Sequence, residues 1–357
     1  MHDILADLVR WRREGETVVL ATVIQTWGSS PRKAGSKMAL TLDGKFTGSV
    51  SGGCVENAVI EAGVESLKAK QSRLLHFGVA DETAWEVGLA CGGSIDIFMK
   101  PLDWNFFEKL RTVIENEEPV VIATIVRGPD ELIGLELFMD DKGQVVGSLG
   151  NEWDGKVLSL ASEALSQGVS RRIASNDDTE IFIDVILPAP TLILVGGVHI
   201  AVALTSLAKS LGYRTIVIDP RKAWGNKERF PHVDQLVQAW PDAAFGEIKI
   251  TRSTAIAMLT HDPKLDDPAL KIALNSPAFY VGALGSKSTN AKRRTRLLND
   301  GVSESQLSYL HAPIGLDIGA ETPEEIALAI LSEVVNAFRK QNQPSAEEEA
   351  KPVSNSL

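Results

Sequence analysis

The stretch Thr191-Leu-Ile-Leu-Val195-Gly196-Gly197-Val-His-Ile-Ala201 decides the fold of the second half of the chain. Its first five residues are typical of a buried strand, its paired glycines of a turn, and residues 202–211 of a helix. A second predicted strand, residues 214–218, ends at Asp219. In dinucleotide-binding folds this arrangement places a pyrophosphate on helix N-terminal amides and ribose hydroxyls on the carboxylate. The sequence therefore predicts a Rossmann-like domain.

The glycine turn departs from the dinucleotide fingerprint at one position. Where G-x-G-x-x-G/A has its middle glycine, this chain has Val198, whose Cβ would crowd the approach of backbone to phosphate. We therefore expect a Rossmann-like fold without tight binding of ordinary NAD. The neighbouring His199 could donate to a phosphate or cap the helix, and we favour capping.

Polar residues follow two later predicted strands, where ligands bind in open α/β sheets. The strand 255–259 is followed by Thr260-His261-Asp262, and the strand 278–281 precedes Gly285-Ser286-Lys287. Ser286, Lys287 and the run Lys292-Arg293-Arg294 would suit a phosphate. A solvated basic helix face is the alternative, which we favour for the arginines. His261-Asp262 has no second His or Cys at supporting spacing, so no zinc site is expected.

The first half of the chain is interpreted as a degenerate duplication. The matching stretches are 16–24 with 118–126 and 42–50 with 141–149. Each copy continues into a predicted helix, over 55–70 and 155–168, so that both are expected to form strand, strand, helix and strand. We therefore predict an N-terminal α+β domain whose copies span about 16–100 and 118–186.

Three glycine-rich loops occur only in the first copy and contain both cysteines of the chain. They are residues 27–37, Ser51-Gly52-Gly53-Cys54, which we align with Asn151-Glu152-Trp153 of the second copy, and Cys91-Gly92-Gly93. Paired glycines let backbone approach a ligand, and the helix predicted after Cys54 favours a thiolate there. The loops indicate binding, although tight turns with packed cysteines, or loop drift, would give the same pattern.

Composition excludes several classes of protein. The chain has 357 residues, of which 44% are hydrophobic and 23% charged, as in soluble globular proteins of more than one domain. The net charge of −11 argues against nucleic acid or a membrane surface as partner. No apolar run approaches the ~18 residues of a membrane span. Residues 2–15 are interpreted as an amphipathic helix that lacks the apolar core and cleavage site of a signal peptide. Two cysteines in so long a chain do not make a disulfide scaffold, so a reducing cytoplasm is expected.

A proline-bearing stretch, Leu187-Pro-Ala-Pro-Thr191, marks the predicted domain boundary. We expect an N-terminal domain over 1–187, a Rossmann-like doubly wound domain over 188–340 and a disordered acidic tail over 341–357. Thr322, Pro323 and Glu325 predict the capped start of a final helix.

Six blocks together resemble the XdhC/CoxI family of xanthine dehydrogenase accessory proteins. They are TWGSSPRKAGSKM, GSVSGGCVENAV, ACGGSIDIF, GGVHIA with DPR, YVGALGSK and PIGLDIGAETPEEIALAI, in order between residue 10 and about residue 340. The resemblance implies an N-terminal domain followed by a Rossmann-like one. It also implies that the protein binds molybdenum cofactor, protects it while a cysteine desulfurase helps install the terminal sulfur, and delivers it to an apo molybdenum hydroxylase. Family members often have Gly-Ala-Gly-His where this chain has Gly196-Gly197-Val198-His199.

The residues expected to bind cofactor are mostly glycines and polar side chains. They are Gly28, Ser29, Ser30, Arg32, Gly35, Gly52, Gly53, Cys54, Glu56, Cys91, Gly92, Gly93, Gly196, Gly197, His199, Asp219, Arg221, His261, Gly285, Ser286 and Lys287. Cys54 and Cys91 would contact molybdenum or a transferred sulfur, since thiolates are soft donors. Molybdopterin or its dinucleotide form is the expected ligand, and NAD(P) is not.

No set of residues for hydride transfer or hydrolysis stands out, so the sequence favours a carrier over a catalyst. Two rival functions are an NAD(P)-dependent oxidoreductase and a thiol redox protein. Val198 argues against the first, and the lack of Cys-x-x-Cys spacing argues against the second. Whether the chain forms a homo-oligomer, and which molybdoenzyme it serves, stay open.

Overall fold

The computed structural model describes residues 1–28, 32–78, 93–174 and 178–341. Two compact units follow one another along the chain, and their described parts are residues 1–188 and 189–341. Within these residues, none of the helices is both long enough and apolar enough to cross a membrane. The predicted tail lies outside them, apart from Gln341 at the end of the last helix.

The first unit contains two five-stranded antiparallel sheets. The first sheet consists of β1 (Val18–Trp27), β2 (Lys37–Thr41), β3 (Phe46–Gly48), β4 (Arg73–Phe77) and β5 (Ser94–Pro101). The second consists of β6 (Val120–Arg127), β7 (Glu136–Asp140), β8 (Val145–Gly147), β9 (Arg171–Ala174) and β10 (Glu180–Ile186). Their strand orders, β3-β2-β1-β5-β4 and β8-β7-β6-β10-β9, correspond one to one. A duplicated unit would give this correspondence, and the duplication itself stays a prediction.

The expected strand, strand, helix and strand is incomplete in both halves of this unit. Two strands, not one, lie between the first strand and the helix in each half, and the helix is followed by an additional edge strand, β4 or β9. These edge strands escaped prediction because they are short and carry charged residues, as Arg73 and Arg171-Arg172 show.

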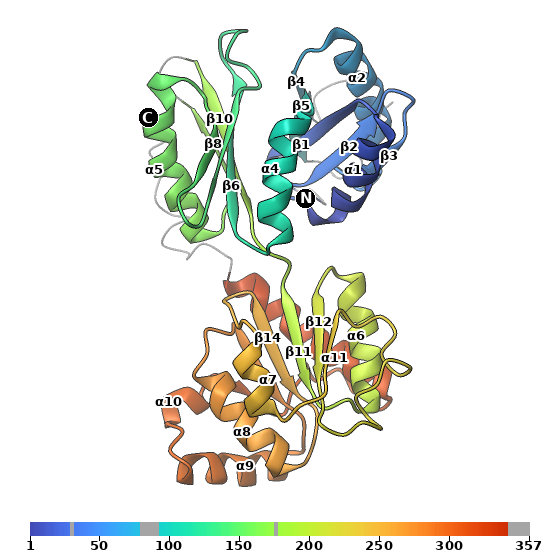
Figure 1. Ribbon diagram of the computed structural model, residues 1–357, viewed down its shortest axis with the longest axis vertical. Helices are drawn as coiled ribbons and strands as arrows, with labels where there is room; N and C mark the ends of the chain where they lie inside the picture. Colours follow the sequence, from blue (N-terminus) through green and yellow to red (C-terminus); the bar gives the residue numbers. More distant parts are fainter. Residues whose placement is uncertain (29–31, 79–92, 175–177, 342–357) are drawn as a thin grey trace. The chain divides into compact units, whose positions relative to one another are not determined.

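One helix covers the outer face of each sheet. Helix α2 (Glu56–Ala69) packs on the first sheet and α5 (Asn151–Gln167) on the second, and Figure 1 shows the two sheets lying between them. The inner faces meet around Ile24, Phe98 and Phe182. Helices α1 (His2–Glu14) and α4 (Trp104–Glu115) pack together at one end through Leu8 and Phe107. Each sheet is therefore packed between a helix on its outer face and the other sheet on its inner face.

The second unit is built on one parallel sheet of six strands. They are β11 (Thr191–Val195), β12 (Arg214–Ile218), β13 (Gln235–Val237), β14 (Thr254–Met258), β15 (Tyr280–Ala283) and β16 (Leu310–His311). Their order is β13-β12-β11-β14-β15-β16, and all neighbouring pairs are parallel. This is the 3-2-1-4-5-6 order of the Rossmann fold, so the predicted fold class is confirmed.

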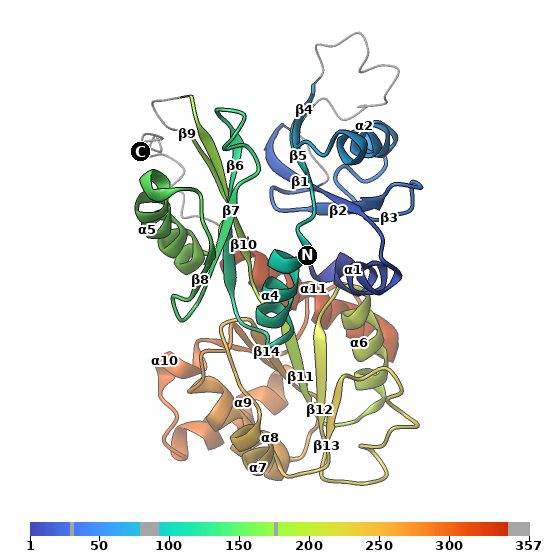
Figure 2. The ribbon, with the colours of Figure 1, turned by 45° about the horizontal axis from the view of Figure 1, so that its top comes forward.

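Helices cover both faces of this sheet, because side chains on a strand alternate between its faces. Leu192 and Leu194 pack against α6 (His199–Ser210) and α11 (Pro323–Gln341). Ile193 and Val195 pack in a second core beneath α7 (Pro241–Glu247), α8 (Pro263–Leu274) and α9 (Lys287–Asn299). Figure 2 shows the two helical layers, and the short helix α10 (Glu304–Leu307) precedes β16.

The start of helix α11 has the predicted capping arrangement. The backbone N–H of Glu325 donates to Oγ1 of Thr322 at 3.2 Å, and the N–H of Thr322 donates to Oε2 of Glu325 at 3.0 Å. Pro323 is the first residue of the helix, where its missing N–H costs no hydrogen bond. The helix therefore begins where the sequence predicts it.

Candidate functional site

The carboxyl edge of the parallel sheet brings together most residues predicted for a site in the second unit. Gly196 follows β11, Asp219 follows β12, and Thr260-His261 lie just beyond β14. Strands β12 and β13 follow β11 on one side of the sheet, and β14 to β16 follow on the other, so the strand order reverses between β11 and β14. Ligands bind at this reversal in open α/β sheets. Gly196 has φ 108°, and a Cβ added there would lie 2.3 Å from Cγ2 of Thr260. Only glycine therefore fits between the ends of these two strands.

Asp219 holds the glycine turn in place. Its carboxylate accepts the N–H of Gly197 at 2.7 Å and the N–H and Nε–H of Arg221 at 2.9 Å each. Asp219 is fully buried. Burial opposes its ionisation, but the hydrogen bonds from Arg221 and Gly197 outweigh burial and lower the pKa of Asp219. To accept hydrogen bonds from ribose hydroxyls, as predicted, Asp219 would have to give up hydrogen bonds from Gly197 or Arg221.

The segment after Asp219 covers the glycine turn. A Cβ added to Gly197 would lie 2.6 Å from the carbonyl oxygen of Trp224, so this glycine is needed for packing against the chain itself. Arg229 donates to the carbonyl oxygens of both Gly197 and Trp224. The guanidinium groups of Arg221 and Arg229 lie 5.0 and 5.3 Å from the centre of the exposed Trp224 ring. An aromatic ring with two cations thus lies beside the switch point.

Helix α6 begins at this edge, and among the described residues no side chain caps its first turn. Val198 is the N-cap residue, and His199 is the first helical residue with an exposed side chain. The prediction that His199 caps the helix is therefore wrong. Its Nε2 lies 3.8 Å from a carboxylate oxygen of Glu324. Amides of an uncapped first turn, together with the positive end of the helix dipole, suit an anion.

The loop after β15 is fixed by its own residues. Ser286 accepts the N–H of Thr289 at 3.1 Å and so caps helix α9, and Lys287 is the first helical residue. Gly285, with φ 139°, precedes them. Ser286 and Lys287 are both exposed, which leaves Lys287 accessible to a ligand.

Arg293 contradicts the prediction of a solvated basic face. It is 1% exposed, and its guanidinium donates to Asp266 at 2.9 Å and to the carbonyl oxygen of Leu284 at 3.1 Å. Thr260 also donates to Asp266. Burial raises the pKa of Asp266 to about 6, against the opposing effects of Thr260 and Arg293. Arg294, next in sequence, is exposed and pairs with Glu304, so the prediction holds for that arginine.

In the first unit, the carboxylate of Glu56 organises the loop of residues 51–54, here called the thiol loop. The backbone N–H groups of residues 50–53 donate to it at 2.8–3.2 Å. The hydroxyls of Ser49 and Ser51 also donate to it, at 2.7 and 2.5 Å. Burial opposes ionisation, but these bonds, chiefly from Ser51 and Ser49, lower the pKa of Glu56 to about 2. The amides that could bind an external anion are therefore filled by the chain's own carboxylate.

The second sheet has a shorter version of the same arrangement. Asp154 accepts the hydroxyl of Ser148 and the N–H of Leu149, both at 2.7 Å. Ser148 and Asp154 are six residues apart, whereas Ser49 and Glu56 are seven apart. Asn151-Glu152-Trp153 form the first turn of α5, so the predicted alignment of these residues with Gly52-Gly53-Cys54 is wrong. The segment from the serine to the carboxylate is therefore one residue longer in the half that contains the thiol loop.

Cys54 lies two positions before helix α2, which begins at Glu56 after the N-cap residue Val55. It is half-buried and packs against the apolar core of the first sheet. Its N–H donates to Oγ of Ser51 at 2.9 Å. Ser29, Ser30, Cys91 and Gly92 lie outside the described residues, so the relation of Cys54 to Cys91 stays a prediction.

The remaining residues predicted for a site in this unit lie at different places in the sheets. Gly28, with φ 70°, follows β1, and the buried Gly93 precedes β5. A Cβ on Gly35, with φ 89°, would lie 2.9 Å from Oδ1 of Asp184 in the second sheet. Gly35 is thus needed for close packing of the two sheets. Arg32 lies near it in sequence and is half-buried.

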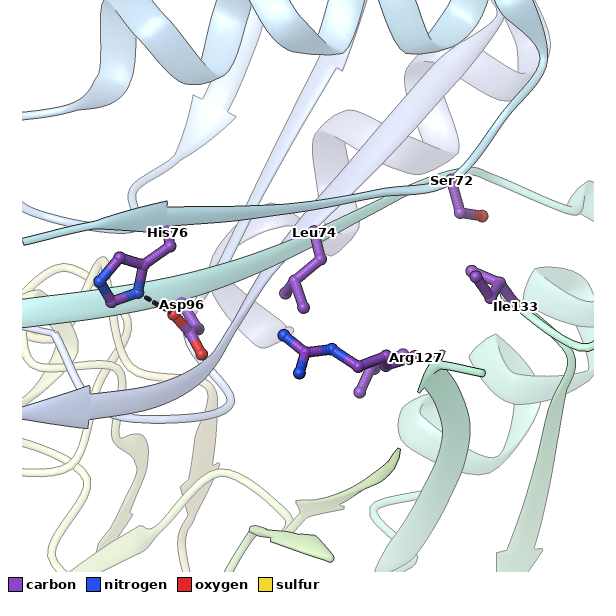
Figure 3. A pocket seen from close by; sticks show the side chains of 7 residues that line it. Ser72, Leu74, His76, Asp96, Arg127 and Ile133 are labelled. Atoms are coloured by element: carbon purple, nitrogen blue, oxygen red, sulfur yellow. Dashed lines mark hydrogen bonds and ion pairs between the residues drawn. The ribbon is translucent and has the colours of Figure 1, made fainter. Parts of the chain in front are cut away.

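A pocket of about 350 Å³ lies between the two sheets of this unit. It is lined by Ser72, Leu74, His76, Asp96, Val126, Arg127 and Ile133. Figure 3 shows His76 beside Asp96 and the guanidinium of Arg127 pointing toward them from the other sheet. Nδ1 of His76 lies 2.6 Å from Oδ1 of Asp96.

The pocket belongs to a chain of ion pairs that crosses between the sheets. Asp96 of β5 also accepts a hydrogen bond from Arg172 of β9, which donates to Glu180 at 2.6 Å. Glu180 in turn lies 3.2 Å from Arg127. Sequence reasoning missed this cluster. Its one local signal is Asp96, a charged residue inside the apolar run Ser94-Ile-Asp-Ile-Phe98. Within the part of the chain that is described, no group of three or more His, Cys, Asp or Glu could hold a metal ion.

Two family models match the chain. Residues 11–78 match the model of the XdhC and CoxI family, and residues 192–334 match that of the XdhC Rossmann domain. The two matches fall in different units and follow the order expected from the six sequence blocks.

Curated proteins and a solved structure are similar over almost the whole chain. A probable xanthine dehydrogenase subunit from Bacillus subtilis is 30% identical over 336 residues, which cover 91% of this chain and 94% of that protein. The molybdenum cofactor insertion chaperone PaoD of Escherichia coli is 25% identical over 343 residues, or 96% of this chain and 90% of that one. A crystal structure described as a xanthine dehydrogenase from Bacillus halodurans has a TM-score of 0.77 at 25% identity, covering 96% of this chain and 97% of that one.

Proposed function

This chain belongs to the XdhC and CoxI family, and from that premise we propose that it is an accessory protein for a molybdenum hydroxylase of the xanthine dehydrogenase type. In this proposal it binds molybdenum cofactor, protects it during sulfuration by a cysteine desulfurase, and delivers it to the apo-enzyme. The name of the Escherichia coli relative supports insertion of cofactor. The name of the Bacillus subtilis relative supports a xanthine dehydrogenase as the client.

The observation that carries this proposal is the carboxyl edge of the parallel sheet. The uncapped first turn of α6 begins there, with the exposed His199 beside it and the partly exposed Arg221 at the end of β12. Molybdopterin and its dinucleotide form both carry phosphate, and helix-terminal amides with neighbouring cations fit a phosphate. The cofactor, when bound, supplies the molybdenum–sulfur centre. The chain's own residues would hold the phosphate end and position the rest.

The thiol loop is the proposed contact for the soft end of the cofactor. Glu56 fixes its backbone, and Cys54 is held beside the start of α2. A thiolate suits molybdenum or a transferred sulfur better than oxygen ligands do. Cys91 remains a second proposed thiol.

A nicotinamide-dependent oxidoreductase is less well supported. The carboxylate that would recognise ribose, Asp219, is buried and already accepts hydrogen bonds from Gly197 and Arg221.

The proposal is tested with full-length protein purified from a molybdenum-replete host. We expect mass spectrometry to find a pterin cofactor released on denaturation, and metal analysis to find molybdenum. Addition of the loaded protein to an apo xanthine dehydrogenase should restore its activity, whereas protein from a host unable to make the cofactor should not. Copurification of a nicotinamide nucleotide without pterin, together with no restored activity, would contradict the proposal.

A further inference from the structure

We propose that the pocket between the two sheets of the first unit is a separate ligand site, which takes a small organic acid. Its carboxylate or phosphate group would be held by Arg127 and His76. Its apolar body would contact Leu74, Val126 and Ile133, which supply the aliphatic lining. This site is distinct from the proposed cofactor site at the sheet edge of the second unit.

The guanidinium and the imidazole that would contact the acid come from opposite sheets. Arg127 ends β6 and is 58% exposed, and His76 lies on β4 and is 59% exposed. Both side chains line the pocket, and Figure 3 shows them on either side of it, with Asp96 next to His76. An anionic group between them would therefore be contacted by both sheets.

The charge of the cluster leaves room for an anion. Its carboxylates are Asp96 and Glu180, and its guanidinium groups are Arg127 and Arg172. These four charges balance, so the cluster has no excess negative charge that would repel an anion. Charge-assisted hydrogen bonds to a carboxylate or phosphate are the strongest that such cations form.

Arg172 holds the carboxylates of Asp96 and Glu180, which contact His76 and Arg127. It is largely buried and donates to Asp96, to Glu180 and to Oε1 of Gln25, the last at 3.1 Å. Asp96 then orients His76, and Glu180 orients Arg127. Outer groups that orient the ligand-contacting ones are typical of binding sites built before the ligand arrives.

The volume and the lining set the class of ligand. A volume of about 350 Å³ lies at the lower end of the range of small-molecule pockets, about 300–1,000 Å³, and is too small for a dinucleotide. Three aliphatic side chains would leave a free inorganic anion without partners on those sides. An acid with a compact apolar body would contact Arg127 and His76 with its charged group and the three aliphatic side chains with its apolar part.

Calorimetric titration of the full-length protein tests the site. The probes are benzoate, phenyl phosphate, inorganic phosphate and the neutral benzamide. We expect benzoate or phenyl phosphate to bind about tenfold more tightly than inorganic phosphate, with no heat from benzamide; which acid binds better identifies the charged group. Arg127→Gln and His76→Gln should each weaken binding about tenfold. Arg73→Gln, on β4 but paired with Glu65, should leave it unchanged.

Three results would overturn the proposal: benzamide binding as well as benzoate, inorganic phosphate binding as well as phenyl phosphate, or equal affinity in Arg127→Gln, His76→Gln and the wild type. Circular dichroism and thermal melting check that the variants fold. If Arg127→Gln does not fold, Arg127→Lys, which retains the charge, and His76→Gln decide the outcome. Cofactor content is measured separately, so failure of this site leaves the proposed function untouched.

Discussion

The backbone N–H of Gly53 donates to Oε2 of Glu56 at 2.8 Å, which closes the loop carrying Cys54 onto the first turn of helix α2. A carboxylate in the first helical turn thus replaces the external anion that a row of loop amides would otherwise attract. The position of the thiol therefore depends on the charge of one glutamate.

Glu56→Gln is expected to lower the free energy of unfolding by about 2 kcal/mol, because a neutral amide accepts the loop N–H groups more weakly and presents donors to them. Urea unfolding monitored by circular dichroism measures the loss. Asp154→Asn is the matched control, since in the described part of the chain Asp154 accepts from one hydroxyl and one amide. An equal loss in the two variants would show that the amides of the thiol loop add nothing.

Stability should also depend on pH through Glu56. Its folded pKa of about 2 lies below the ordinary 4.5, so the fold favours the ionised form. This contribution is complete above pH 4.5 and is lost as the pH falls toward 2. Between these values the wild type should lose more unfolding free energy than Glu56→Gln. Parallel stability profiles of the two proteins would contradict this origin of the shift.

The parts of the fold that the sequence predicts well are those with one dominant local pattern. Strands β11 and β12 form at the predicted residues because buried parallel strands are continuous apolar runs, here bounded by Gly196 and Asp219. The cap of α11 is equally local. Strand β9, Arg171–Ala174, has no such pattern, since it is an edge strand whose arginines find their partners on other elements: Arg171 on α5, and Arg172 on β10 and on β5 of the other sheet.

The candidate sites were harder to predict because their decisive contacts join distant residues. Three consecutive basic residues on α9 look alike in sequence, and only the position of Asp266 on α8 makes Arg293 the buried one. The pocket depends in the same way on Arg172 reaching Asp96 from another sheet. His76 carried no motif, and only the strand register places it opposite Asp96.

Breaking the buried pair of Arg293 and Asp266 should be costly. Arg293→Met leaves a buried carboxylate whose remaining donor, among the described residues, is Thr260, and we expect a loss of about 3–5 kcal/mol of unfolding free energy. Arg294→Met is the control, because an exposed ion pair contributes about 1 kcal/mol or less. Thermal and urea unfolding compare them. Similar losses would mean that the buried pair contributes no more than a surface pair.

Placing a carboxylate at the start of α6 should prevent phosphate binding there. Val198→Asp puts an N-cap acceptor and a negative charge at the first turn, which competes with an anionic ligand. We expect the variant to fold and to retain about tenfold less cofactor on purification, with Val198→Ser, a neutral cap, losing less. Molybdenum and pterin per protein chain are the measurements. Full retention in Val198→Asp would place the phosphate elsewhere.

Replacing Cys54 by serine tests the thiol loop directly. Serine is close in size, and Cys54 is only half-buried, so the unfolding free energy should fall by about 1 kcal/mol or less. Serine remains a protonated alcohol at neutral pH and is a harder ligand than a thiolate, so we expect less cofactor or transferred sulfur to be retained.

The reactivity of this thiol is measured in a Cys91→Ser background, which leaves Cys54 as the only cysteine of the chain. Iodoacetamide should label Cys54 in protein without cofactor, and bound cofactor should protect it, because the two compete for the same sulfur. Peptide mass spectrometry follows the labelling, and activation of an apo molybdenum hydroxylase follows delivery. If Cys54 resists labelling in the native protein and Cys54→Ser still loads and delivers cofactor normally, the thiol packs against the first sheet and the loop has a structural role alone.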